Sequence, residues 1–126
     1  MFPEVIEIPK IFGGKDVIYL PTVKTHGNSI TTGTIKNSFG GLLEEVRHYC
    51  HKYIHEVLVD LVLLQQEIHP NIFAVMDGMI CDDGSEPRTI IPKLKNNLLV
   101  SNDSVAIDAV AAKITGFAGY PKTPFS

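Results

Sequence analysis

Three short polar clusters directly follow apolar runs of this chain, and they hold side chains that could do chemistry. The runs span residues 16–20, 71–76 and 97–100. The clusters behind them contain, in order, Lys24 with His26, Asp77, and Asp103. If the runs are parallel strands, all three clusters lie at one carboxyl edge, where open α/β sheets bind ligands. The spacing therefore predicts where a site lies and leaves its reaction open.

The first two clusters hold groups that transfer protons or bind ions. Lys24-Thr25-His26-Gly27 could hold an anion, a metal or a substrate carboxylate. Asp77 ends a run and precedes Gly78, a common place for a hard-metal ligand or a general base. The alternatives, a solvated loop around Lys24 and a turn-forming aspartate at Asp77, stay open.

Residues 33–40 have glycines at both ends but do not match a phosphate-binding loop. The glycine spacing is wrong, and no Lys-Ser or Lys-Thr pair follows Gly40. Backbone N–H groups of this segment, with the charge of Lys36, could still hold an anion. Glycines that only permit tight turns explain the segment equally well.

Three histidines, His48, His51 and His55, fall on one side of a helical wheel. His51 and His55 have the i, i+4 spacing that lets two imidazoles share a metal. No glutamate lies between them where a zinc-protease helix would have one. A solvated histidine face is the alternative to a metal site.

The cysteines argue against a thiol-based site. Cys81 lies beside Asp82, but no activating base is identifiable near it, which favours an inert thiol. Cys50 is the only other cysteine, and two cysteines favour a reduced, cytoplasmic protein over a disulfide framework. Two thiols also cannot hold an iron–sulfur cluster alone.

Composition sets the class of protein. The chain has 126 residues, 44% of them hydrophobic and 20% charged, which fits one globular domain. Its net charge of −3 offers no basic excess for nucleic acid. No apolar run approaches the roughly 18–20 residues that span a bilayer, so we expect no membrane partner.

The apolar patterns predict the elements that position these residues. Short β-branched runs between turn signals predict strands, and three- and four-residue spacing predicts helices. We expect a short helix over 32–39, a long helix over 44–68, a polar loop over 78–96 and a helix over 104–115 that Asp103 or Asn102 caps. Long crossovers between the strands predict an α/β fold with a mostly parallel sheet and flanking helices.

Five segments together resemble the family called domain of unknown function 362 (DUF362). The segments, in the order of the family's motifs, are residues 21–26, 33–40, 51–60, 72–78 and 98–116. The chain departs from the family at Thr22, where a lysine is usual, and in the loop over 78–87. The resemblance implies that this chain is the later part of a larger domain.

The resemblance also implies where the family's signature positions lie. They are Lys24, His26, Lys36, Asn37, His51, His55, Asp60, Asp77 and Asp108. The family is prokaryotic and is often fused to a ferredoxin-type, iron–sulfur module, but it has no settled reaction. A ferredoxin-type or other protein partner is therefore expected to supply any iron–sulfur cluster.

We expect a metal- or anion-binding domain of a redox-associated protein. His26, Lys24 and Asp77 are the expected catalytic residues, and Lys24, Lys36 and Asn37 the anion-binding residues. His26, His51, His55 and Asp77 are the expected ligands of a divalent metal. The alternatives are a non-catalytic interaction module, as a homo-oligomer or with another protein, and an inactive remnant.

Overall fold

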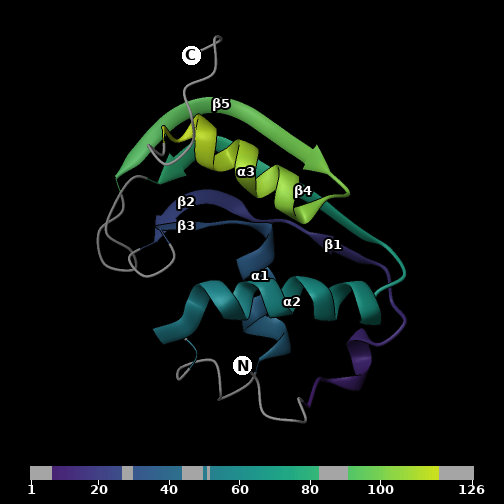
Figure 1. Cartoon of the computed structure of the whole chain (residues 1–126). Helices are drawn as coiled ribbons and strands as arrows, with labels where there is room; N and C mark the ends of the chain where they lie inside the picture. The colour runs from purple at the N-terminus through teal and green to yellow at the C-terminus, as the bar shows by residue number, and fades with distance from the viewer. Residues whose placement is uncertain (1–6, 27–29, 44–49, 51, 83–90, 117–126) are drawn as a thin grey trace.

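The protein forms one mixed β-sheet with its helices gathered on one side. The computed structural model describes residues 7–26, 30–43, 50, 52–82 and 91–116. The elements are a 3-10 turn η1 (Lys10–Phe12), strands β1 (Val17–Tyr19), β2 (Thr22–His26), β3 (Ile30–Thr32), β4 (Ile72–Asp82) and β5 (Pro92–Ser101), and helices α1 (Thr34–Leu42), α2 (Ile54–Ile68) and α3 (Ser104–Ile114). This arrangement confirms the predicted α/β class (Figure 1).

Strand β4 organises the sheet, because both of its edges are paired. Strands β1 and β2 run parallel to β4, and β3 pairs antiparallel with β2. Strand β5 pairs antiparallel with β4, with Ala74 opposite Ser101 and Asp82 opposite Pro92. A shift in register between Gly78 and Ile80 bends this ladder.

The antiparallel course of β5 corrects one prediction. The cluster at Asp103 follows β5 and so lies beside the amino end of β4, opposite the carboxyl edge that the parallel assumption gave it. The prediction was wrong because a short connection permits an antiparallel neighbour, whereas a parallel one needs a crossover of a dozen or more residues.

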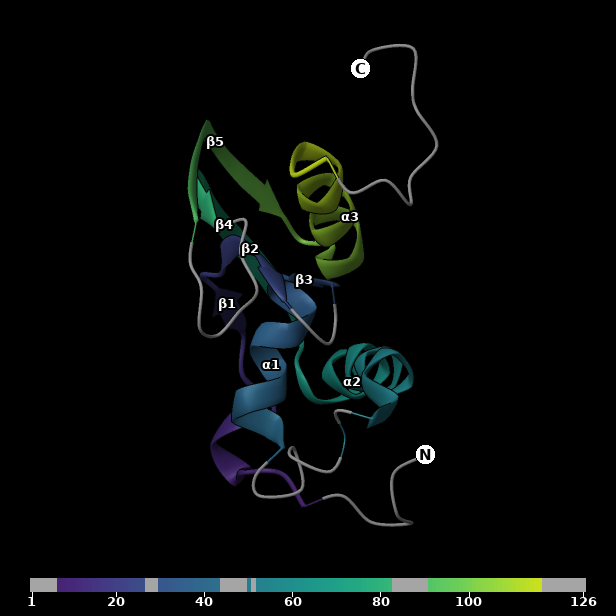
Figure 2. The ribbon, with the colours of Figure 1, turned by 90° about the vertical axis from the view of Figure 1, so that its left-hand side faces the viewer.

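Helix α3 packs on β4 and β5. Helix α1 contacts both α3 and α2, so the three helices lie together on the same side of the sheet (Figure 2). Val23, Met76 and Cys81 from the sheet pack against Ile107 and Ala111 of α3. A separate apolar cluster joins α1 to α2 through Phe39, Leu42, Ile54, Val57 and Leu61. The two clusters fix which face of each strand is buried.

The strand bounds also correct the predicted loop over 78–96. Strand β4 continues to Asp82 and β5 begins at Pro92, while residues 83–90 lie outside the described part. Hydropathy missed the first half of β5 because residues 92–96 are all exposed, so no apolar alternation marks them. Main-chain pairing to β4 forms the strand in spite of its polar side chains.

Helices match the predictions in part. The predicted helix over 44–68 is α2 from Ile54 onward, while 44–49 and 51 lie outside the described residues. Helix α3 agrees, and Asp103 caps it by accepting hydrogen bonds of 2.9 Å from the N–H groups of Val105 and Ala106. Among the described residues, no helix is long and apolar enough to cross a membrane.

Candidate functional site

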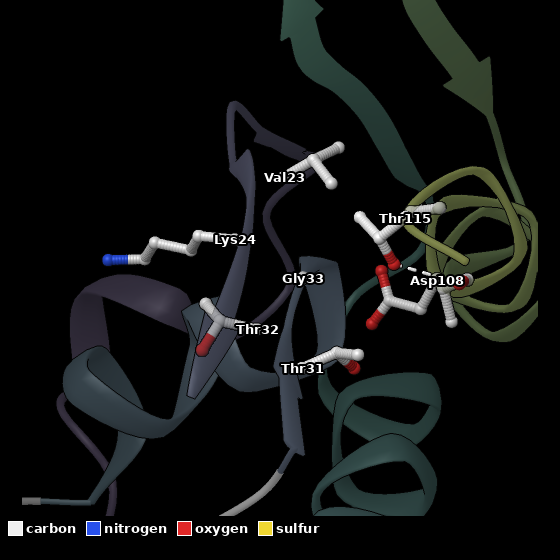
Figure 3. Close-up of a pocket in the computed structure, with 9 residues that line it drawn as sticks. Val23, Lys24, Thr31, Thr32, Gly33, Asp108 and Thr115 are labelled. Atoms are coloured by element: carbon white, nitrogen blue, oxygen red, sulfur yellow. Dashed lines mark hydrogen bonds between the residues drawn. The ribbon is translucent and has the colours of Figure 1, made fainter. Parts of the chain in front are cut away.

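The expected catalytic residues occupy neighbouring strands. Lys24 and His26 lie on β2, and Asp77 lies on β4 opposite Thr22. Asp77 alternates with the buried Met76, so it lies on the face of the sheet turned away from α3. Lys24 alternates with the buried Val23 and extends away from α3 (Figure 3). Lys24 and Asp77 therefore share one face, while the side chain of His26 lies outside the described part.

The other expected ligands are spread over two helices. Lys36 and Asn37 lie in α1, His55 is exposed at the start of α2, and His51 lies outside the described residues. Within the described part of the chain, no three His, Cys, Asp or Glu side chains gather as a metal site would require. The metal assignment stays a prediction that rests on groups including His26 and His51.

A small polar pocket lies at the carboxyl ends of the parallel strands β2 and β4. Its cavity measures about 60 Å³, enough for a small ion or a few waters but not for a nucleotide. The pocket is lined by Thr25, Cys81, Asp82, Lys93, Lys95 and Thr115. The edge predicted from strand direction therefore holds a pocket, built from a different set of side chains.

Asp82 is the most constrained polar group of this pocket. Only 8% of the residue is exposed, and its Oδ1 accepts a hydrogen bond of 2.9 Å from the N–H of Ile91. Its Oδ2 is buried and has no hydrogen-bond partner within the described part of the chain. A buried carboxylate oxygen without a donor is costly, so this atom favours a ligand that brings a donor.

Cys81 lines the same pocket with a buried thiol. Its side chain is almost fully buried, and its Sγ lies 3.7 Å from the carbonyl oxygen of Gly78. Burial raises the pKa of the Cys81 thiol; the charge of Lys95 opposes this rise and that of Asp77 adds to it. The predicted inert thiol agrees with this environment, because a thiol with a raised pKa is a poor nucleophile.

Lys93 and Lys95 are the pocket residues that the sequence analysis missed. Lys93 lies opposite Cys81 on β5, and Lys95 follows two residues later on the same strand. Their Lys-x-Lys spacing is the signal that could have found them, since alternate residues of a strand share a face. Because this segment was predicted as a loop, in which alternate residues need not share a face, the spacing of the two lysines was not interpreted.

Asp108 forms a second buried polar centre, at the junction of α3 and α1. Its Oδ1 accepts a 2.7 Å hydrogen bond from the N–H of Thr34, and its Oδ2 a 3.0 Å bond from that of Ile35. A side chain at Gly33 would collide with this carboxylate, so glycine permits the close approach (Figure 3). The cavity beside Asp108 measures only about 10 Å³.

Asp108 takes the place that an anion would have at the predicted anion site over residues 33–40. Two N–H groups at the start of α1 could have received an anion, and the carboxylate of Asp108 already occupies both. Burial raises the pKa of Asp108, and the hydrogen bonds from Ile35 and Thr34 oppose that rise. Asp108 therefore acts as a helix cap supplied by another helix.

Besides the strand-end pocket and the cavity beside Asp108, an open groove of about 500 Å³ lies between α2 and the start of α3. Its lining is mostly uncharged: Val62, Gln65, Gln66, Ile72, Asn102, Asp103, Ser104 and Val105. Gln65 is buried, and its Nε2 donates a hydrogen bond of 2.9 Å to the hydroxyl of Ser38, while its Oε1 has no hydrogen-bond partner among the described residues. Among the described residues that line it there is no lysine or histidine, and its one carboxylate, Asp103, already caps α3, so the groove offers no positive charge for an anion.

Comparison with known proteins agrees with the resemblance seen in the sequence. The profile of the domain of unknown function (DUF362) family matches residues 4–113. The chain therefore belongs to this family, whose description names no activity. No curated protein and no solved structure matches the chain.

Proposed function

We propose that the strand-end pocket binds a small anionic ligand that also brings a hydrogen-bond donor. The observation behind this proposal is the buried Oδ2 of Asp82, which lacks a donor in a pocket that two lysines line. The lysine ammonium groups favour an anionic part of the ligand. Asp82 would repel a ligand that presented only acceptors, so the ligand needs an O–H or N–H group as well. Monohydrogen phosphate and small hydroxy acids have this chemistry.

The same pocket offers a place for proton transfer. A ligand that reaches the buried Oδ2 of Asp82 could pass the proton of its O–H group to this carboxylate. Lys24 and His26 belong to the adjacent strand β2, but the side chain of Lys24 extends to the other face of the sheet, so we expect Lys93 and Lys95 to supply the charge at this pocket. The protein would then bind and deprotonate a small acid.

A divalent metal is the other form of this proposal. Asp82 and Cys81 supply a carboxylate and a thiol at one pocket, and further ligands would have to come from His26 or from residues beyond the described part. Metal content of protein purified without air, measured by mass spectrometry, tests this form. Stoichiometric metal that disappears in the Asp82→Asn variant supports it, and protein without metal contradicts it.

The wider role that we propose is redox-associated, with a ferredoxin-type partner in the prokaryotic cytoplasm. This part rests on the family resemblance alone. Its test is co-purification of the protein with an iron–sulfur partner, and a partner free of iron would contradict it.

The anion proposal is tested by calorimetric titration with inorganic phosphate at pH 7. Lys95→Gln removes a charge that lines the pocket, and we expect phosphate to bind about tenfold more weakly, as the loss of one charge-assisted hydrogen bond predicts. Lys10→Gln is the matched control, because Lys10 is exposed in η1 at a distance from the pocket. Equal affinity in the wild type and Lys95→Gln would contradict the proposal.

A further inference from the structure

The sheet has a second face, opposite α3, that is apolar and exposed. We call this surface the open face. Its large side chains come from β1, β4 and β5, and their exposed fractions are 65% for Ile18, 40% for Phe73, 57% for Ile80, 68% for Leu94, 61% for Leu98 and 54% for Val100. In Figure 2 the sheet is seen close to edge-on, and α2 and α3 both lie on its other side. None of the described helices covers the open face.

Strand register gathers these side chains into one patch along β4, with Asp77 beside Leu98 near its middle. Ile18 is paired with Phe73, and Val100 is paired with Val75. Near the other end of the ladder, Ile80 is paired with Leu94. Paired residues on one face of a sheet lie about 5 Å apart, so the patch follows β4 along most of its length.

The area of this patch fits an interface between proteins. With roughly 100 Å² exposed on each of the six side chains, it measures about 600 Å², the upper end for a monomer surface. Two such patches together bury about 1,200 Å², which reaches the range of stable interfaces. An area of this size supports a partner that presents an equal apolar face.

The charges on the open face support a second copy as that partner. Among the described residues, Lys24 and Asp77 place one positive and one negative charge on this face, so these two charges do not make two copies repel each other. A two-fold axis that passes between Lys24 and Asp77 would bring each lysine toward the aspartate of the other copy. The same chain thereby supplies both the apolar area and the complementary charge.

The edge of β5 argues for stacked faces over edge-to-edge pairing. Pro92 removes one backbone donor, and Lys93 and Lys95 add charge along the first half of this edge strand. Proline and lysine on an edge are recognised devices against pairing with another sheet. The described part of the open face presents large apolar side chains around Lys24 and Asp77.

We propose that the open face binds the open face of a second copy of this chain, as two stacked sheets of a two-fold dimer. The partner sheet would lie about 10 Å away, with strands rotated by about 30°, as in β-sandwiches. This dimer leaves the strand-end pocket accessible, because Thr25, Cys81 and Thr115 lie on the α3 side of the sheet.

Sedimentation velocity over a hundredfold range of protein concentration tests the dimer. Leu98→Lys places a charge at the centre of the patch, and we expect its dimer to dissociate at concentrations at least tenfold higher than the wild type's. Val110→Lys is the matched control, because Val110 is 48% exposed on α3, and its dimer should match the wild type's. A wild-type protein that stays monomeric throughout, or equal effects of both substitutions, would overturn the proposal.

A second measurement separates a second copy from a segment of the same chain as the cover. In the monomer range, Leu98→Lys should melt within about 2 °C of Val110→Lys if only another copy covers the face. A much lower melting temperature for Leu98→Lys would mean that the chain covers its own open face, and the dimer proposal would be wrong.

Discussion

Asp82 and Asp108 are two buried carboxylates with opposite surroundings. Asp108 has a donor on each oxygen, both from the backbone of α1, and a cavity beside it of only about 10 Å³. Asp82 has one donor, an unpartnered second oxygen and a cavity of about 60 Å³. The difference separates a carboxylate that holds the fold from one placed to receive a ligand.

Removal of the Asp108 carboxylate should produce the largest effect on stability. Asp108→Ala leaves the N–H groups of Thr34 and Ile35 without their acceptor and separates α3 from α1, so we expect a loss of about 2–4 kcal/mol in the free energy of unfolding. Urea denaturation monitored by circular dichroism measures it. A loss below about 0.5 kcal/mol would show that Asp108 does not join the helices.

The free energy of unfolding, measured over a series of pH values, tests the burial of Asp108 a second time. Because burial raises the pKa of Asp108, the folded protein holds a proton on this group that the unfolded chain has already released. The free energy of unfolding should therefore fall as pH rises from the ordinary aspartate range through the raised pKa of the folded state.

Asp108→Asn isolates this contribution, since it retains the shape of the side chain but cannot titrate. The stability of the wild type relative to Asp108→Asn should fall across that pH window. Parallel stability curves for the two proteins would contradict the raised pKa.

Substitution at Asp82 should have the smallest effect on stability and a clear effect on binding. Asp82→Asn keeps an acceptor for the N–H of Ile91 and removes a buried charge, so unfolding free energy should change by less than about 1 kcal/mol. Phosphate binding should weaken, because the amide oxygen accepts from Ile91 and the NH2 group that replaces Oδ2 donates and cannot accept the ligand's hydrogen bond. Tighter phosphate binding in Asp82→Asn would mean that the ligand brings no donor.

Much of the fold could be predicted from the sequence because its central elements follow simple patterns. The buried run at the start of β4 and the capped helix α3 depend on local signals, and both are confirmed. Strand β5 could not be bounded, because its polar first half forms only through pairing with β4. Its direction, which moves Asp103 to the far end of the sheet, is also a property of tertiary pairing.

The candidate site was predictable in location more than in composition. Parallel strands place their carboxyl ends together, and that rule located the pocket near the ends of β2 and β4. The identity of its lining depends on the pleat and on the irregular register around Gly78, which the sequence does not display. Lys24 and Asp77 consequently lie on the face opposite Cys81.

The two carboxylates can be distinguished directly by titrating ¹⁵N-labelled protein with phosphate and following the backbone amide signals. If the strand-end pocket is the binding site, the signals of Cys81, Asp82 and Lys95 should shift with a single dissociation constant. The amide signals of Thr34 and Ile35 should not shift, because their N–H groups already donate to Asp108. Shifts confined to Thr34 and Ile35, or no shifts at millimolar phosphate, would contradict the assignment of the site to Asp82.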